Sequence, residues 1–332
     1  MKLTLEEAKA LAAAALKTAD VSTENAEVVA DALVAAERDG LASHGLSRVA
    51  YYADQARAGK VDGRARPSLS ENAAVVMVDA RHGFAYPGVA AGLARAQTLA
   101  REYGLAAVGV TNSHHFGVAG HPVERIAEAG LIGIAMGNAP ASIAPWGGKR
   151  PLYGTDPIAF SAPRLQRSPL VIDLSVSRVA RGKVMLAART GEAIPDNWAL
   201  DAEGRPTTDP QAALAGSMVP MGEAKGAALA LMVEILSAGL TGANFGYEAS
   251  SLFDAEGPPT DIGQFFLILD PSRFAGREVF LERIEALFAR MLEEPDVRLP
   301  GSRRLAAREK SLREGIEVDD AIYEDLLARA GG

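Results

Sequence analysis

The chain has 332 residues, of which 48% are hydrophobic and 23% charged, as is ordinary for a soluble globular protein with one large domain or two. Its formal net charge of −8 and the lack of a basic tract disfavour nucleic acid as a partner. The sequence has no cysteine, which excludes disulfides, thiolate nucleophiles and cysteine-ligated zinc, and its five histidines lack the spacing of metal ligands, so we expect no metal site.

The first segment, MKLTLEEAKALAAAALK, carries two glutamates where a secretory signal would be apolar, and its acidic residues also count against a transit peptide. No uninterrupted apolar run reaches membrane-spanning length. We therefore expect a soluble, cytoplasmic protein without a membrane partner.

Helical patterns dominate both ends of the chain. Thr4, followed three residues later by Glu7, forms a capping-box pattern that predicts a helix over 4–19. Further helices are predicted over 24–38, from Ser43 to Gly59, and at 276–293, 302–314 and 319–330. The two ends are expected to pack together, which makes 1–70 plus 275–332 a discontinuous helical domain and 71–274 an α/β domain.

The middle of the chain alternates apolar runs with helical patterns. Strands are predicted at 73–80, 105–111, 131–137, 157–162, 169–175 and 264–270, and their nearly continuous apolar character is typical of strands covered on both faces. Helices are predicted at 86–103, 118–129, 178–190 and 222–242. This alternation indicates an α/β fold.

The stretch ASHGLSRVAYY (42–52) is the first candidate site. If Ser43 caps a helix, then His44, Arg48 and Tyr52 recur every four residues on one face, which drifts by about 40° per step. Arginine binds carboxylates through a two-pronged fork, and the other two side chains add further polar groups. A solvated polar face is the simpler interpretation, but Gly45 inside a helix is costly unless something approaches closely.

The stretch NSHHFG (112–117) follows an apolar run, where we interpret it as the loop beyond the carboxyl end of a parallel strand, a usual ligand position in open α/β sheets. His114 or His115 could exchange a proton with a ligand there, because the pKa of histidine lies near neutral pH. The alternative is that the histidines only cap the backbone of their own loop.

Three further segments allow either a functional or a non-functional interpretation. The Pro- and Gly-rich loop 138–157 contains Thr155 and is either a binding loop or an ordinary surface loop. Lys225 in the first turn of a helix opposes the helix dipole, so it either meets an anionic ligand or is simply solvated. The arginines of PGSRR (300–304) could hold a phosphate or form a surface cluster. Neither GxGxxG nor a P-loop is present, so the usual nucleotide fingerprints are missing.

These residues resemble the type 2 malate/L-lactate dehydrogenase family, which also includes sulfolactate and ureidoglycolate dehydrogenases and piperideine/pyrroline-2-carboxylate reductases. The resemblance covers the whole chain and rests on SHGLSRVAYY, NSHHFG, APWGG, GTDPIAFSAP, IDLSVSRVARGK, WALDAEGRPTTDP, GEAKGAAL and PGSRR. It implies a non-Rossmann NAD(P)-binding sandwich of the sulfolactate dehydrogenase-like type, with NAD or NADP as cofactor, a small carboxylate substrate and a homodimer whose site is shared between subunits.

The resemblance also implies roles for individual residues. His115 resembles the family's acid/base, and Ser43 and His44 match its Ser-His pair. Substrate contacts are implied for Arg48, Tyr52 and Thr155. Cofactor contacts are implied for His44, Gly120, His121, Asp173, Leu174, Ser175, Lys225, Gly301, Arg303 and Arg304.

Two departures bear on the substrate. Lys183 stands where the imino-acid reductases carry an acidic residue, which argues against imine reduction, and Glu223 replaces a glycine or proline of the family motif. We expect reduction of a small 2-oxo acid of the malate, lactate or sulfolactate type, with Arg48 on the carboxylate. Reduction of cyclic imino acids is the alternative. A hydrolase using Ser43 and His44 is less favoured, since no GxSxG elbow exists. A non-catalytic binding protein on the same fold is a further, less favoured alternative.

Overall fold

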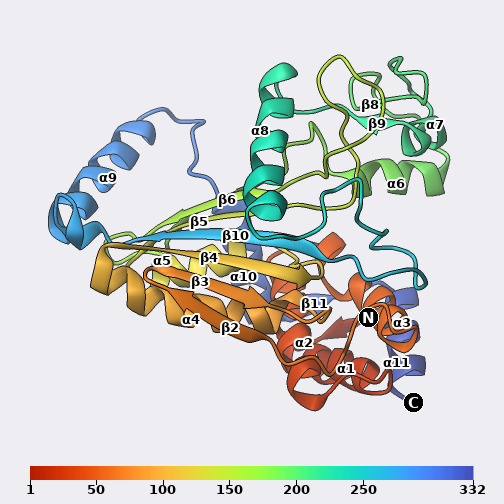
Figure 1. Cartoon of the computed structure of the whole chain (residues 1–332), viewed down its shortest axis with the longest axis horizontal. Coiled ribbons are helices and arrows are strands. Elements are labelled where there is room, and N and C mark those ends of the chain that lie inside the picture. The colour runs from red at the N-terminus through yellow and green to blue at the C-terminus, as the bar shows by residue number, and fades with distance from the viewer. Residues whose placement is uncertain (332) are drawn as a thin grey trace.

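The structure is a computed structural model that describes residues 1–331. A seven-stranded sheet runs through its centre in the order β2-β3-β4-β10-β5-β6-β7 (Figure 1). Its strands are β2 Ser68–Asn72, β3 Val75–Asp79, β4 Leu105–Ser113, β5 Ile132–Gly137, β6 Ile158–Ala162, β7 Leu170–Leu174 and β10 Ile262–Leu269. The six predicted strands are therefore present, and β2, a strand of mostly exposed residues, is the one that apolar patterning missed.

The sheet is mixed rather than parallel. Only β3 and β4 pair in parallel, and every other neighbouring pair is antiparallel. Our interpretation of β4 as a strand of a parallel sheet therefore holds for one of its two neighbours. The apolar runs come from two-sided cover, which does not require parallel pairing: α4 (Ala85–Tyr103) and α5 (Gly120–Glu128) pack on one face, and the π-helical segment Ile235–Gly239 packs against β10 on the other.

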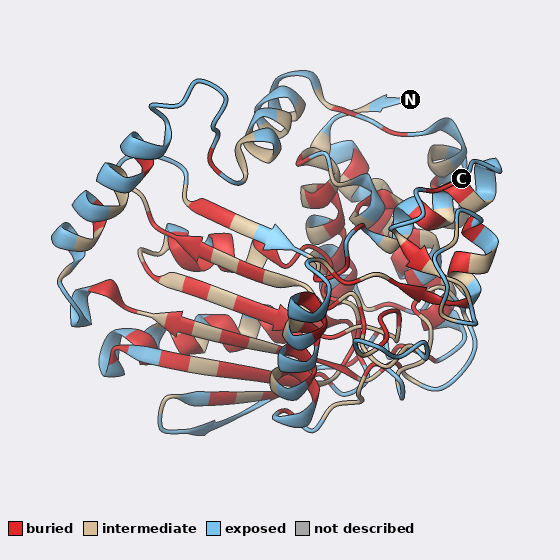
Figure 2. Cartoon of the chain, turned by 90° about the horizontal axis from the view of Figure 1, so that it is seen from above, coloured by how far each residue is buried: buried red, intermediate tan, exposed pale blue. Residues whose placement is uncertain are grey.

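The N-terminal and C-terminal segments pack together. Strand β1 (Lys2–Leu3) pairs with β11 (Ile316–Glu317), and α1 (Leu5–Lys17) contacts both α2 (Thr23–Arg38) and α11 (Asp320–Ala330). Thr4 and Glu7 form the predicted capping box. This unit has an alanine-, leucine- and valine-rich core of its own, drawn from both ends of the chain (Figure 2).

The third predicted helix is wrong over its first turn and a half. Two 3₁₀ turns, Ala42–His44 and Leu46–Arg48, precede α3 (Val49–Arg57), and Ser43 caps no helix. Gly45 separates the two turns, and a Cβ there would overlap the Glu37 carboxylate, which accepts the Leu46 N–H at 2.9 Å. Close approach is thus the reason for this glycine, but its neighbour is the chain's own Glu37.

A smaller unit projects from the sheet. It contains α6 (Arg181–Thr190), β8 (Ala199–Leu200), α7 (Pro210–Ala215), β9 (Ser217–Met218) and α8 (Ala224–Glu234), with a separate apolar core. The helix predicted over 222–242 therefore begins at Ala224 and changes at Ile235–Gly239 into a π-helical segment.

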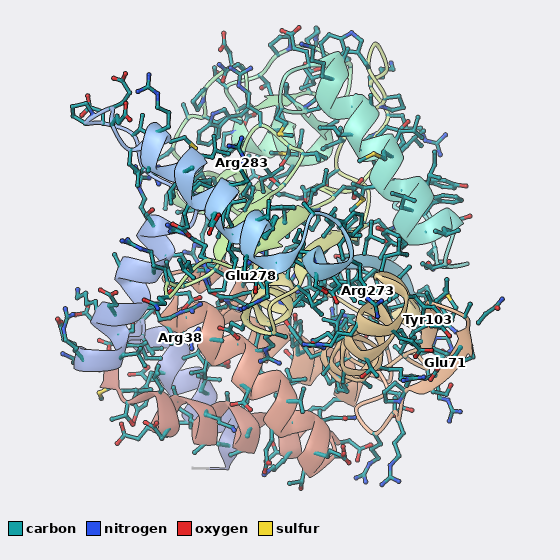
Figure 3. All side chains as sticks on the ribbon, turned by 90° about the vertical axis from the view of Figure 1, so that its left-hand side faces the viewer. Arg38, Glu71, Tyr103, Arg273, Glu278 and Arg283 are labelled. Atoms are coloured by element: carbon teal, nitrogen blue, oxygen red, sulfur yellow. The ribbon has the colours of Figure 1, made fainter. Side chains whose placement is uncertain are left out.

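The remaining C-terminal elements are η4 (Pro271–Arg273), α9 (Arg277–Met291) and α10 (Ser302–Glu314). Helix α9 packs Phe288 against Leu170 on β7 and carries Glu278 and Arg283 to the surface (Figure 3). No helix within residues 1–331 is long and apolar enough to cross a membrane.

Candidate active site

The loop after β4 brings one histidine of the pair into a polar cluster. Nδ1 of His115 lies 2.7 Å from the hydroxyl of Tyr52, which is itself 3.2 Å from the hydroxyl of Tyr86. Tyr52 is buried and His115 is half-buried, so the tyrosine fixes one edge of the imidazole. Within residues 1–331 Nε2 of His115 forms no hydrogen bond, which leaves that atom available to a ligand.

A second histidine faces the first. The rings of His44 and His115 have centroids 5.5 Å apart, and Oγ of Ser43 lies 2.9 Å from Nδ1 of His44. The structure therefore brings the predicted Ser-His pair and His115 together, although the local helix that we expected to do so is absent.

Arg48 belongs to the same cluster. Its Nε donates to the Ser43 carbonyl at 2.8 Å, and its guanidinium lies over the ring of Phe253 at 4.9 Å from the centroid. The positive charge of Arg48 also acts on His44 and His115, lowering the pKa of each imidazole. The guanidinium and the proton-transfer candidate thus share one site, as the sequence hypothesis requires.

Burial favours the neutral form of both site histidines. Desolvation first, and then the charge of Arg48, lowers the pKa of His44 to about 4 and that of His115 well below its usual value. No carboxylate among the described residues raises the pKa of either imidazole again. A bound carboxylate would do so.

The adjacent His114 differs from His115. It is buried, and both of its ring nitrogens lack a partner within residues 1–331. Burial, followed by the charge of Lys60, lowers its pKa to about 3. The ring packs edge-on against Tyr52 and Phe84. His114 therefore packs against Tyr52 and Phe84 inside the protein, whereas Nε2 of His115 is available to a ligand.

Sequence reasoning missed the segment that covers Arg48. The buried ammonium of Lys60 donates to the carbonyls of Ser251, Asp254 and Glu256 at 2.6, 2.9 and 3.2 Å. These bonds hold the loop 251–256 so that Phe253 lies on Arg48. A lysine in the turn after α3 gave no signal of this role, because its partners are backbone carbonyls about 190 residues away.

The loop that carries Thr155 is held by backbone hydrogen bonds and by the buried carboxyl group of Glu234. The carbonyl of Thr155 accepts the N–H of Val176 at 2.9 Å. The next residue, Asp156, is fully buried, and burial followed by the negative charge of Glu234 raises its pKa well above the usual range. Glu234 accepts the backbone N–H groups of Gly154 and Gly246, so this carboxyl group holds Gly154 of the loop in place.

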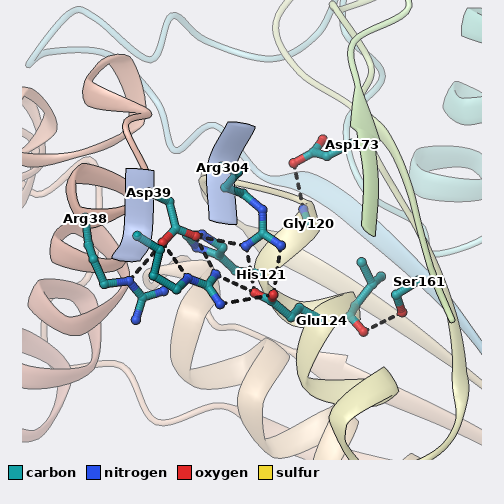
Figure 4. A network of polar contacts seen from close by, with 10 residues as sticks. Arg38, Asp39, Gly120, His121, Glu124, Ser161, Asp173 and Arg304 are labelled. Atoms are coloured by element: carbon teal, nitrogen blue, oxygen red, sulfur yellow. Dashed lines mark hydrogen bonds and ion pairs between the residues drawn. The ribbon is translucent and has the colours of Figure 1, made fainter. Parts of the chain in front are cut away.

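The residues expected to contact the cofactor lie at two places. Near the start of α5, the N–H of Gly120 donates to Asp173 at 2.7 Å, on the strand end that continues into Leu174 and Ser175 (Figure 4). Lys225 lies exposed at the start of α8, beyond a groove of about 530 Å³ that is lined in part by Arg178 and Glu223.

His121 and Arg304 lie in an internal ion cluster. His121 Nε2 is 3.1 Å from Asp39, and Arg304 donates to Asp39 at 2.9 Å and to Glu124 at 2.8 Å (Figure 4). Arg308 binds the same two carboxylates. In the described structure the Arg304 guanidinium is thus already engaged.

The neighbouring residues of PGSRR differ from Arg304. Arg303 is exposed and forms no ion pair within residues 1–331, and Gly301 lies against the carbonyl of Val171 with a positive φ of 81°.

The two departures from the family pattern are exposed. The Lys183 ammonium lies 5.9 Å from the centre of the Trp198 ring, and Glu223 precedes α8 with a positive φ of 58°. No cluster of three or more residues able to hold a metal ion is found within residues 1–331.

Comparison with known proteins gives a consistent picture over the full length. A sequence profile of the malate/L-lactate dehydrogenase family matches residues 3–327. The chain is 58% identical over 328 residues to a (2R)-3-sulfolactate dehydrogenase (NADP(+)) of Chromohalobacter salexigens, covering 99% of this chain and 98% of that protein. It is 38% identical over 328 residues to Delta(1)-pyrroline-2-carboxylate reductase 1 of Burkholderia ambifaria, covering 98% and 96%.

Solved structures agree with this assignment. A delta1-piperideine-2-carboxylate reductase from Pseudomonas syringae superposes with a TM-score of 0.93 at 38% identity, covering 99% of each chain. The sulfolactate dehydrogenase of Methanocaldococcus jannaschii gives a TM-score of 0.90 at 30% identity, covering 100% of this chain and 97% of that one. The predicted fold class is confirmed.

Proposed function

We propose a specific reaction for this chain, which belongs to the malate/L-lactate dehydrogenase family. It is an NAD(P)-dependent oxidoreductase, and its reaction is the interconversion of (2R)-3-sulfolactate and 3-sulfopyruvate with NADP. One observation carries the choice of substrate and cofactor: the chain is 58% identical to the Chromohalobacter sulfolactate dehydrogenase but only 38% identical to the Burkholderia imino-acid reductase.

The site suits a 2-oxo acid. Arg48 is a half-buried guanidinium with no carboxylate partner within residues 1–331, and it is held in place by the Ser43 carbonyl and Phe253. It would bind the carboxylate next to the reacting carbon. His115, fixed through Nδ1 by Tyr52, would then direct Nε2 at the substrate oxygen.

Proton transfer follows from this arrangement. In reduction, protonated His115 gives its Nε2 proton to the carbonyl oxygen, and in oxidation the neutral ring takes the proton from the hydroxyl. The low pKa of the His115 imidazole favours the neutral ring. Binding of a carboxylate at Arg48 neutralises one cause of that low pKa, so the substrate itself promotes the protonated form needed for reduction.

The chain also has residues that fit a nicotinamide dinucleotide. The exposed cations Lys225 and Arg303 would hold its phosphates, and the start of α5 at Gly120 and the segment Asp173–Ser175 would line its path. A bound nicotinamide supplies the hydride in reduction and accepts it in oxidation. Orientation of the substrate by Arg48 and Thr155 would bring the reacting carbon to it.

Reduction of cyclic imino acids is the second candidate, because the Pseudomonas syringae reductase has the same fold over 99% of both chains. A substrate panel separates the two. We expect the highest kcat/KM with 3-sulfopyruvate and NADPH, weaker reduction of oxaloacetate and pyruvate, and little reduction of Δ1-piperideine-2-carboxylate. A preference for the cyclic imine would overturn the proposed substrate class.

We also propose that the enzyme is a homodimer with a site shared between subunits. Helix α8, the π-helical segment and the residue that follows it expose large apolar side chains, among them Leu231, Ile235 and Leu240 at 46%, 54% and 61%. Large apolar side chains exposed together in this way are typical of a covered interface. Light scattering should give twice the chain mass, and Ile235→Glu should shift it toward the monomer, whereas a monomeric wild type would disprove the proposal.

A further inference from the structure

Among the half-buried arginines, two have no carboxylate partner within residues 1–331. Eight arginines are half-buried within residues 1–331, and six of them form ion pairs with carboxylates: Arg38, Arg95, Arg164, Arg304, Arg308 and Arg329. The remaining two, Arg48 and Arg181, have no carboxylate partner among the described residues. Charges that are partly removed from water are normally paired, so each of these guanidinium groups is suited to receive an anion from a ligand.

Arg181 lies at the first position of α6 and has one side-chain contact. Its Nη1 donates to Oγ of Ser142 at 2.8 Å, and the other N–H groups of the guanidinium form no hydrogen bond within residues 1–331. Ser142 is buried and also donates to the Pro140 carbonyl at 3.2 Å, so it holds the guanidinium in place without neutralising it. Desolvation lowers the pKa of Arg181, as is expected for a cation without a counter-ion.

The position of Arg181 relates it to the proposed substrate loop. Ser142 and Thr155 belong to the same loop, 138–157, which is closed on itself by hydrogen bonds between Ile143 and Tyr153. Val176, shortly before Arg181, donates to the Thr155 carbonyl at 2.9 Å. Arg181 is therefore fixed against the loop that carries Thr155, while Arg48 approaches from the 3₁₀ turns of the N-terminal segment.

We propose that Arg181 binds the second acidic group of a doubly charged substrate, the group farthest from the carboxylate that Arg48 holds. This inference rests on the proposed function, in which the substrate carries a carboxylate and a sulfonate. Two separate guanidinium groups without carboxylate partners match two anionic groups on one ligand, and a planar fork of N–H donors suits the oxygens of a sulfonate. Arg181 would thus distinguish 3-sulfopyruvate from pyruvate.

The test compares Arg181→Met with Arg189→Met, an exposed arginine of the same helix. We expect Arg181→Met to lower kcat/KM for 3-sulfopyruvate ten- to hundredfold, mainly through KM, because a charged hydrogen bond is lost. The value for pyruvate should change less than about threefold, and Arg189→Met should leave both unchanged. Arg181→Lys should restore part of the loss.

The remaining outcomes separate the possible sources of the anion and the two proposals. An equal loss with pyruvate and 3-sulfopyruvate, or a loss seen with NADPH but not with NADH, would overturn the inference, because the group would then be structural or would bind the cofactor phosphate. The melting temperature of Arg181→Met should equal or exceed that of the wild type, since a half-buried cation without a carboxylate partner is removed; a large fall would also count against the inference.

The wild-type enzyme distinguishes failure of this inference from failure of the proposed function. If the wild type does not reduce 3-sulfopyruvate, the proposed function fails. If it reduces oxaloacetate instead, and Arg181→Met selectively impairs oxaloacetate over pyruvate, the role of Arg181 as receptor of the second anion is supported. If the wild type reduces 3-sulfopyruvate and Arg181→Met does so equally well, only the inference fails.

Discussion

At the residue scale, two histidines compete for the role of proton donor. His115 is fixed by Tyr52 and keeps Nε2 open, whereas Nδ1 of His44 is 2.9 Å from Ser43. We expect His115→Ala to lower kcat by ~10²–10⁴-fold with little change in cofactor affinity, because proton transfer typically contributes that factor. His44→Ala should lower it less. Steady-state rates and fluorescence titration with NADPH check this, and the reverse order of the two variants would assign the proton to His44.

The pKa values of these histidines give a second prediction. Nuclear magnetic resonance of the free enzyme should show His44 titrating near pH 4 and His115 well below 6.5. Because both pKa values are lowered in the folded protein, these histidines bind protons below pH 6.5 in the unfolded chain but remain neutral in the folded one. The free energy of unfolding should therefore fall as the pH drops below 6.5. Arg48→Met should raise both pKa values. A His115 pKa at or above 6.5 in the wild type would contradict this account.

At the scale of elements, the loop 251–256 positions Arg48 by placing Phe253 against its guanidinium. Lys60→Met removes three of the hydrogen bonds that hold the loop 251–256 and leaves the one from Gln55 to Asp254, so Phe253 should move away from the guanidinium. We expect a severalfold higher KM for the 2-oxo acid and faster proteolysis within the loop, measured by limited digestion. Lys17→Met, which alters an exposed ion pair, is the control and should match the wild type. Unchanged digestion of Lys60→Met would show that the loop is held by other contacts.

The elements also show what the sequence could and could not predict. The apolar run before NSHHFG located the end of β4, and hence His115, because burial on both faces leaves a clear pattern. The single helical face through His44, Arg48 and Tyr52 was wrong, since the two 3₁₀ turns around Gly45 depend on Glu37, a residue of another helix. Such tertiary contacts have no local signature. The roles assigned to the site residues stay predictions.

At the scale of the whole molecule, the units of the fold meet at the ion cluster of Asp39, His121, Glu124, Arg304 and Arg308. Asp39 ends α2, the acidic partner Glu124 lies on α5, and the two arginines come from α10 (Figure 4). Arg308 and Asp39 are 269 residues apart, so no sequence pattern connected them. The cluster fixes the start of α5, beside the expected cofactor path, against both ends of the chain.

Removal of the central carboxylate should therefore weaken the whole structure. Asp39→Asn leaves Arg304 and Arg308 with Glu124 as their only carboxylate, and breaking a buried ion pair in this way typically costs about 3–5 kcal/mol in the free energy of unfolding. Asp20→Asn, which breaks an exposed pair with Arg64, is the matched control and should change little.

The pH dependence of the stability lost in Asp39→Asn shows whether Asp39 acts through its charge or through packing. The arginines hold the pKa of Asp39 far below its usual 3.8, so the stability that its charge contributes is present above pH 3.8 and is lost as the pH falls below it. Urea unfolding should then show a large difference between Asp39→Asn and the wild type at pH 7 and a smaller one near pH 3. A difference that is the same at both pH values would mean that Asp39 acts through shape, and not through its charge.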